Sequence, residues 1–149
     1  MAETKPLRLL AESQADLEIL SAAIQDSVIK AENLKYDARR RRFTIELNRY
    51  RWEHEIKTGE KARIRSILAF DGVLSVRTRA ITKADPDMVM SLLNVTFKPD
   101  IDPPGGEVSL LFAGDGELAL SVEALDATLL DSEYEWGTKR TPDHERRRK

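Results

Sequence analysis

Apolar and polar residues alternate with a period of two over much of the chain after residue 27, and this pattern limits the fold more than any other feature. Successive side chains of a strand point to opposite faces, so the alternation is typical of strands that bury one face. Residues 42–47 show it most clearly, because Phe43, Ile45 and Leu47 fall on one face. Further segments with strand character lie at residues 7–10, 28–29, 33–36, 62–70, 73–81, 91–98, 108–112, 117–122 and 124–130. The sequence therefore predicts a mainly antiparallel β protein.

Two glycine-containing turns predict hairpins between these strands. Asp71-Gly72 separates segments 62–70 and 73–81, and an Asp-Gly pair favours a type I′ turn because both positions need a positive φ. Gly114-Asp115-Gly116 separates segments 108–112 and 117–122 in the same way. Each pair of segments is therefore predicted to form an antiparallel hairpin.

One helix is predicted near the N-terminus. Ser13 stands three residues before Asp16, which resembles a capping box, and Leu17, Leu20 and Ile24 follow at helical spacing. This pattern predicts a helix over residues 14–25. The polar segment 54–61, which contains a glycine, is predicted to be a loop.

The expected fold class is α+β, mainly antiparallel β, built as a curved sheet or partly closed barrel with one N-terminal helix. A pleckstrin-homology-like (PH-like) barrel is one candidate, although that fold usually carries its long helix at the C-terminus. A chain of 149 residues corresponds to about one domain. We expect a single mostly-β domain over residues 1–136 and a disordered basic tail over residues 137–149.

The N-terminal residues and the cysteine count bear on location. Residues 1–6 are polar and open no apolar segment of the kind that begins a signal peptide. The longest apolar runs are far shorter than the about 20 residues that cross a bilayer. The sequence contains no cysteine, which excludes disulfides, thiolate nucleophiles and cysteine-bound metals. We therefore expect a cytoplasmic protein without a membrane partner.

The sequence lacks the common catalytic motifs, including the phosphate-binding G-x-x-x-x-G-K-[ST] loop, H-E-x-x-H and G-x-S-x-G. His144 lies in the predicted tail, which leaves His54 as the only candidate base or metal ligand. Its neighbours Glu53 and Glu55 would point to the opposite face of a strand, and a solvated histidine is the ordinary interpretation. We therefore expect no catalytic residue, no metal and no cofactor.

Charge is distributed unevenly along the chain. Residues 30–83 hold 15 basic and 7 acidic side chains, a net charge of +8, whereas residues 84–135 hold 1 basic and 12 acidic side chains, a net charge of −11. Such asymmetry is a hint of nucleic-acid contact. The favoured interpretation is that the two segments lie on neighbouring strands of one domain and pair their charges there.

The candidate binding site combines four consecutive arginines at a predicted turn, residues 39–42, here called the arginine turn, with a basic aromatic segment at residues 48–52. Arginines supply charge for phosphates, and aromatic rings supply stacking surfaces for bases. For the arginine turn, the alternatives are that it is solvated or that it pairs with the acidic stretch 131–136, within one molecule or between two copies. For the aromatic residues, the alternatives are that a bulge near Asn48 turns them into the core, or that the helix or another strand covers the outer face. The candidate residues are Arg39, Arg40, Arg41, Arg42, Tyr50, Arg51 and Trp52.

The chain resembles members of a small bacterial family that is catalogued only as a domain of unknown function. The resemblance is carried by Leu7-Arg8-Leu9-Leu10-Ala11, Ala31-Glu32-Asn33-Leu34-Lys35-Tyr36, Arg49-Tyr50-Arg51-Trp52-Glu53 and Leu125-Asp126-Ala127. It covers nearly the whole chain and implies no activity, cofactor or site residue.

We expect a non-enzymatic cytosolic binding or adaptor domain whose partner is a protein or a second copy of the chain. The alternative is a nucleic-acid-binding module, most plausibly for single-stranded RNA, that uses the arginine turn with Tyr50 and Trp52. A third hypothesis is an enzyme with a nonstandard site around His54.

Overall fold

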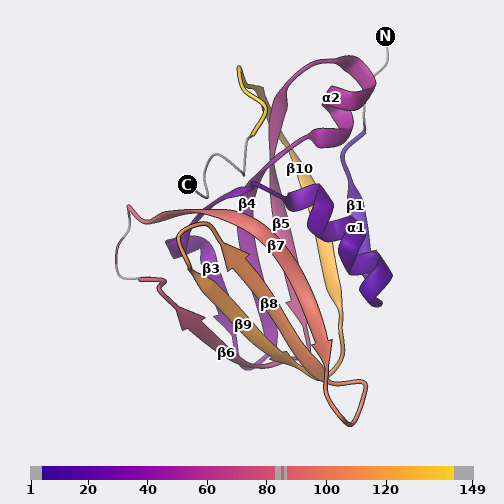
Figure 1. Ribbon diagram of the computed structural model, residues 1–149, viewed down its shortest axis with the longest axis vertical. Helices are drawn as coiled ribbons and strands as arrows, with labels where there is room; N and C mark the ends of the chain where they lie inside the picture. The colour runs from indigo at the N-terminus through magenta and orange to yellow at the C-terminus, as the bar shows by residue number, and fades with distance from the viewer. Residues whose placement is uncertain (1–4, 83–84, 86, 143–149) are drawn as a thin grey trace.

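Most of the chain forms one curled antiparallel sheet in the computed structural model, which describes residues 5–82, 85 and 87–142 (Figure 1). Within these residues the strands are β1 (Arg8–Ala11), β2 (Val28–Lys30), β3 (Leu34–Asp37), β4 (Arg42–Tyr50), β5 (Ala62–Asp71), β6 (Val73–Arg79), β7 (Val89–Pro99), β8 (Gly106–Phe112), β9 (Glu117–Val122) and β10 (Ala127–Gly137). The helices are α1 (Gln14–Ile24), α2 (Trp52–Thr58) and the short 3₁₀ helix η1 (Ala31–Asn33). The predicted fold class, α+β with mainly antiparallel strands and an N-terminal helix, is confirmed.

The sheet is open and has the strand order β1-β10-β5-β4-β2-β7-β8-β9-β6, with β3 also paired to β4. In Figure 1 the strands β7, β8 and β9 lie in front of β4, β5 and β10, so the curled sheet encloses a core between its two halves. β2 pairs with β4 only at Val28 and Asn48. β3 pairs with β4 further along, beginning with Leu34 opposite Ile45. η1 connects β2 to β3, and among the described residues β4 has no strand partner on this side between the two pairings, which leaves an opening in the sheet between β2 and β4.

The predicted periodicity is confirmed in the core. Phe43, Ile45 and Leu47 are buried on the inner face of β4, and α1 adds its own buried side chains, Leu17, Leu20 and Ile24. α1 begins after Ser13, whose hydroxyl accepts a hydrogen bond of 3.1 Å from the backbone N–H of Asp16. Such a cap contributes about 1 kcal/mol.

The predicted hairpin at Asp71-Gly72 is wrong. β5 and β6, both described in full, are not paired with each other, because β4 and β10 occupy the two sides of β5 and β6 pairs with β9. Gly72 has a φ of 72°, whereas a type I′ turn needs a positive φ at Asp71 as well, and Asp71 is not among the positive-φ residues. The turn instead carries the chain from one half of the sheet to the other. The second predicted hairpin, at residues 114–116, is confirmed by the pairing of β8 with β9.

The predicted loop over residues 54–61 is also wrong, because α2 covers most of it. The helix ends at Gly59, whose φ of 78° lies in the left-handed region and whose N–H donates to the carbonyl oxygen of Glu55 at 2.7 Å. Seven residues are too few to show helical periodicity, and the polar residues of α2 are held by ion pairs and hydrogen bonds that a sequence does not display.

The C-terminal segment continues past the predicted domain boundary. β10 extends to Gly137, the N–H of Thr138 donates to the carbonyl oxygen of Lys61, and the hydroxyl of Thr141 donates to Glu55 at 2.7 Å. The remainder of the predicted tail, residues 143–149, lies outside the described residues. Neither described α-helix combines the length and the apolar composition that a membrane span needs.

Candidate functional site

The arginine turn lies at the start of β4, and three of its four arginines are paired with carboxylates of the same chain. Arg40 lies 3.8 Å from Asp37, Arg42 Nε lies 2.7 Å from Asp71 Oδ1, and Arg41 pairs with Glu123. The alternative in which this turn pairs with residues 131–136 within one molecule is therefore wrong. All four arginines are exposed, so these pairs contribute little net stability.

Tyr50 and Trp52 lie at the opposite end of β4 from the arginine turn. β4 has nine residues and is about 26 Å long at about 3.3 Å per residue, so the fold does not bring the two halves of the predicted site together. Tyr50 is fully buried, and its hydroxyl donates to Glu55 at 2.6 Å. Trp52 is half-buried, packs edge-on against Tyr50 with ring centroids 4.7 Å apart, and donates its indole N–H to the carbonyl oxygen of Gln25.

Tyr50 is buried by cover over the outer face of its strand, and not by the bulge that was the other alternative. The register of β4 with β5, two fully described strands, is continuous from Arg42 to Tyr50, so Tyr50 keeps the outward parity of its strand. It is buried because α2 and residues 138–142 fold over the side of the sheet opposite to the core at that end of β4, where Thr141 and Glu55 contact its hydroxyl. Of the two alternatives for Tyr50, the buried one is confirmed.

A buried ion cluster that sequence reasoning missed lies beside these residues. The guanidinium of Arg49 donates two hydrogen bonds to Asp131, at 2.8 and 2.6 Å, and two to Glu53, both at 2.9 Å. The Arg49 and Asp131 side chains are both 0% exposed. Asp131 also accepts from the hydroxyl of Ser66 at 2.6 Å and from the backbone N–H of Leu7 at 2.7 Å.

The cluster connects four elements and the residues before β1, and its contacts lower the pKa of both carboxylates. Burial opposes ionisation of Asp131, but the hydrogen bonds from Arg49 and Ser66 outweigh it and lower the pKa of Asp131 below its ordinary value. Burial likewise opposes ionisation of Glu53, and its hydrogen bonds with Arg49 lower its pKa. Because each charge is paired, the cluster holds β10, β5, β4, α2 and the residues before β1 together. An arginine at an inward position of an alternating strand was the only sequence signal for it.

Arg51, the remaining candidate residue, belongs to the same structural network. It is 3% exposed, pairs with Glu135, lies 3.3 Å from Glu53 and donates to the carbonyl oxygen of Lys5. The acidic stretch 131–136 therefore reaches Arg49 and Arg51 rather than the arginine turn.

Within the described residues, five ion pairs join an arginine of the basic segment 30–83 to a carboxylate of the acidic segment 84–135. These pairs are Arg41–Glu123, Arg49–Asp131, Arg51–Glu135, Arg77–Glu107 and Arg79–Glu117. The predicted pairing across neighbouring strands holds for Arg79 and Glu117 on β6 and β9, whereas the other pairs join residues that are not on neighbouring strands.

His54 lies on α2 and is buried, with Nε2 3.4 Å from Glu60. Its Nδ1 atom has no hydrogen-bond partner among the described residues. No group of three or more histidine and carboxylate side chains in the described part of the chain could hold a metal ion. Among the described residues, the hydrogen-bond partner of the His54 ring is the exposed carboxylate of Glu60.

The face of β1, β10, β5 and β4 that is turned away from α1, here called the outer face, carries large exposed apolar side chains. Leu10 is 57% exposed, Ile67 48% and Leu130 43%. Leu130 and Ile67 are direct partners across β10 and β5, and Leu10 follows on β1 opposite Thr128. Leu130 and Ile67 are thus direct neighbours, and Leu10 lies diagonally from Leu130 on the adjacent strand, although the three residues are far apart in the sequence.

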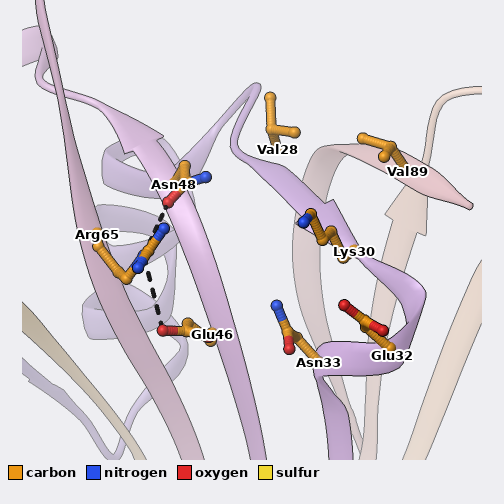
Figure 2. Close-up of a pocket in the computed structure, with 8 residues that line it drawn as sticks. All are labelled: Val28, Lys30, Glu32, Asn33, Glu46, Asn48, Arg65 and Val89. Carbon is orange, nitrogen blue, oxygen red and sulfur yellow. Dashed lines mark hydrogen bonds and ion pairs between the residues drawn. The ribbon is translucent and has the colours of Figure 1, made fainter. Parts of the chain in front are cut away.

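The outer face is hollowed beside this apolar group. A recess of about 290 Å³ lies at the opening between β2 and β4, and Figure 2 shows Arg65 between Asn48 and Glu46 on its β4 side. Arg65 Nε lies 3.5 Å from Asn48 Oδ1 and 3.6 Å from Glu46. A second recess of similar volume adjoins Ile67. Its lining residues are Asn33, Lys35, Thr44, Glu46 and Ile67.

Comparison with known protein families assigns the chain. The model of a family described as a protein of unknown function, DUF2948, matches residues 7–144. The chain belongs to the DUF2948 family. This confirms the resemblance noted in the sequence. No match was found for this DUF2948 protein among curated proteins or among solved structures.

Proposed function

We propose that this DUF2948 protein is a non-enzymatic docking domain that binds a protein through its outer face. The observation that carries the proposal is the group formed by Leu10, Ile67 and Leu130, exposed on three adjacent strands. Contiguous exposed apolar side chains mark interaction sites, whereas single ones are common on any surface.

The energetics favour covering this face. Burying the exposed part of each of the three side chains contributes about 1 kcal/mol, since full burial of a Leu or Ile contributes about 1.5–3 kcal/mol. Of the described helices, α1 packs against the core, and α2 covers the Tyr50 end of the outer face, away from Leu10, Ile67 and Leu130. The part of the outer face around these three residues is therefore available to a partner.

Single-stranded RNA is less well supported as the partner. Tyr50 is buried, and the arginine turn is largely paired and lies at the far end of β4 from Trp52. An enzymatic role for His54 has only the contact with Glu60 in its favour. A bacterial and cytoplasmic setting stays a prediction from the sequence.

Site-specific photo-crosslinking in the host cell tests the proposal. A photoreactive amino acid placed at Ile67 or Leu130 is expected to give discrete adducts, which disappear when Leu10→Asp is added. Matched controls are Leu74 and Ile101, which are 49% and 99% exposed on other parts of the molecule. The same adducts at all four positions, or none at Ile67 and Leu130, would contradict docking at the outer face.

A further inference from the structure

We infer that the protein docked on the outer face is a second copy of this chain, related by a two-fold axis that runs parallel to the strands. The inference rests on the proposed function and names its partner. It comes from one row of residues across four strands. In this row, Arg8 lies opposite Leu130, Leu130 opposite Ile67, and Ile67 opposite Glu46.

The row is basic at one end, apolar in the middle and acidic at the other end. Neighbouring strands are about 4.8 Å apart, so the row spans about 14 Å. A two-fold axis in the interface reverses the row of the second copy. Leu130 then faces Ile67 of the second copy, and Arg8 faces its Glu46. Each of these contacts occurs twice, which is the self-complementary pattern of an isologous dimer.

The adjacent row is compatible with the same axis. It runs from Leu10 through Thr128 and Ala69 to Thr44. Reversal places Leu10 against Thr44 of the second copy and Thr128 against its Ala69. These side chains are small or apolar and uncharged, so the two sheets can approach each other. Face-to-face sheets with nearly aligned strands are a common packing arrangement.

The acidic end of the row has room for an arginine. The recess beside Ile67 is lined by Glu46, Asn33 and Thr44, together with Lys35, and has a volume of about 290 Å³. Glu46 lies 3.6 Å from Arg65, and both side chains are more than 40% exposed. Exposed pairs of this kind are weak, so Glu46 can turn toward Arg8 of the second copy.

The sheet edges are less suited to joining two copies. Within the described residues β6 pairs only with β9, which leaves its other side free. Antiparallel pairing of two β6 strands would bring Arg77 and Arg79 of both copies together, and like charges on an edge strand oppose such pairing. β1, the other edge, has only four residues.

A charge exchange tests the inference by sedimentation equilibrium of purified full-length chains. Arg8→Glu and Glu46→Arg are each expected to raise the dimer Kd about tenfold or more, because each replaces two attractive contacts by two repulsive ones. An equimolar mixture of the two variants is expected to dimerise like the wild type. In the mixed dimer the glutamate introduced at position 8 faces the arginine introduced at position 46, and the other contact keeps its native Arg8 and Glu46. A chain that carries both substitutions is also expected to dimerise like the wild type, because both contacts between positions 8 and 46 still join opposite charges.

Arg39→Glu is the matched control, because it makes the same change of charge at an exposed arginine of the distant turn. Its Kd is expected to stay within about twofold of the wild type. Circular dichroism confirms that each variant is folded. A wild type that remains monomeric at its highest soluble concentration would overturn the inference, as would a mixture that does not recover dimerisation.

Crosslinking separates failure of this inference from failure of the proposed function. Adducts at Ile67 with twice the mass of the chain support both. Discrete adducts of another mass support docking of a different protein and overturn the second copy. The absence of site-specific adducts overturns both.

Discussion

At the scale of single residues, the most consequential feature is a full positive charge in the core. Arg49 is completely buried and is held by Asp131 and Glu53 through four hydrogen bonds. A buried pair of this kind contributes little net stability relative to apolar residues, but removal of one partner is costly because the other charge stays buried. The residues proposed from the sequence as a binding segment, 50–52, thus lie next to a structural cluster.

Arg49→Met is expected to lower the free energy of unfolding by about 3 kcal/mol near neutral pH, since Asp131 loses its partner. In the wild type the pKa of Asp131 and that of Glu53 are lowered by folding. Their contribution is therefore present above the unfolded pKa of about 4 and is lost as pH falls through the folded pKa. In the variant, Asp131 is buried without Arg49, so its pKa is expected to rise. Acidification is then expected to cost the variant less stability than it costs the wild type, or to increase the stability of the variant.

Urea unfolding from about pH 7 to about pH 3 measures this difference. Arg40→Met, which removes an exposed arginine 3.8 Å from Asp37, is the control and is expected to follow the wild type. Parallel pH profiles for wild type and Arg49→Met would show that the cluster is not the source of the pH dependence.

At the scale of elements, α2 shows how a short helix is defined by its end rather than by its periodicity. Gly59 ends it in the left-handed region, and the helix carries residues that cover Tyr50 and complete the ion cluster. The helix thereby buries the end of β4 that lies opposite the arginine turn.

Gly59→Ala is expected to destabilise the protein by about 1 kcal/mol, because a Cβ disfavours a φ of 78°. A Cβ at Gly59 would meet no atom within 4 Å, so the cost is conformational and not steric. Gly59→Asn is expected to cost less, since asparagine tolerates the left-handed region. Urea unfolding of the two variants measures the difference. Equal losses would indicate that another property of Gly59 matters.

At the scale of the whole molecule, the opposite charges of the two segments largely neutralise each other. In the described part of the chain, five ion pairs cross between segments 30–83 and 84–135, and the net charge of the chain is −2. A nucleic-acid backbone would have to compete with these carboxylates for the arginines. The outer face instead joins residues from β1, β10, β5 and β4 into one surface.

Labelled mixed-sequence RNA is expected to bind the wild type no more tightly than a variant with alanine at Arg39, Arg40, Arg41 and Arg42. Fluorescence anisotropy across a salt series measures this, with Trp fluorescence as a second signal. Low salt is the most demanding condition, because charges are screened least there. Tight binding that weakens steeply with salt and disappears in the variant would restore the RNA hypothesis.

The sequence by itself determined the local elements of this protein. The alternation at Phe43, Ile45 and Leu47 assigned β4 and its buried face, and the Ser13 cap assigned the start of α1, because both depend on neighbours within a few residues. The turn at Gly114 likewise joins adjacent strands. These signals are local, so they do not depend on how the chain folds back on itself.

Only the tertiary structure decided which distant residues meet. It placed β10 and not β6 beside β5, brought Asp131 to Arg49, and aligned Arg8, Leu130, Ile67 and Glu46 in one row. Arg8 and Leu130 are separated by more than a hundred positions in the chain, and pairing of strands over such distances depends on the register of the whole sheet. No local pattern records that register, which is why the candidate docking face could not be predicted from the sequence.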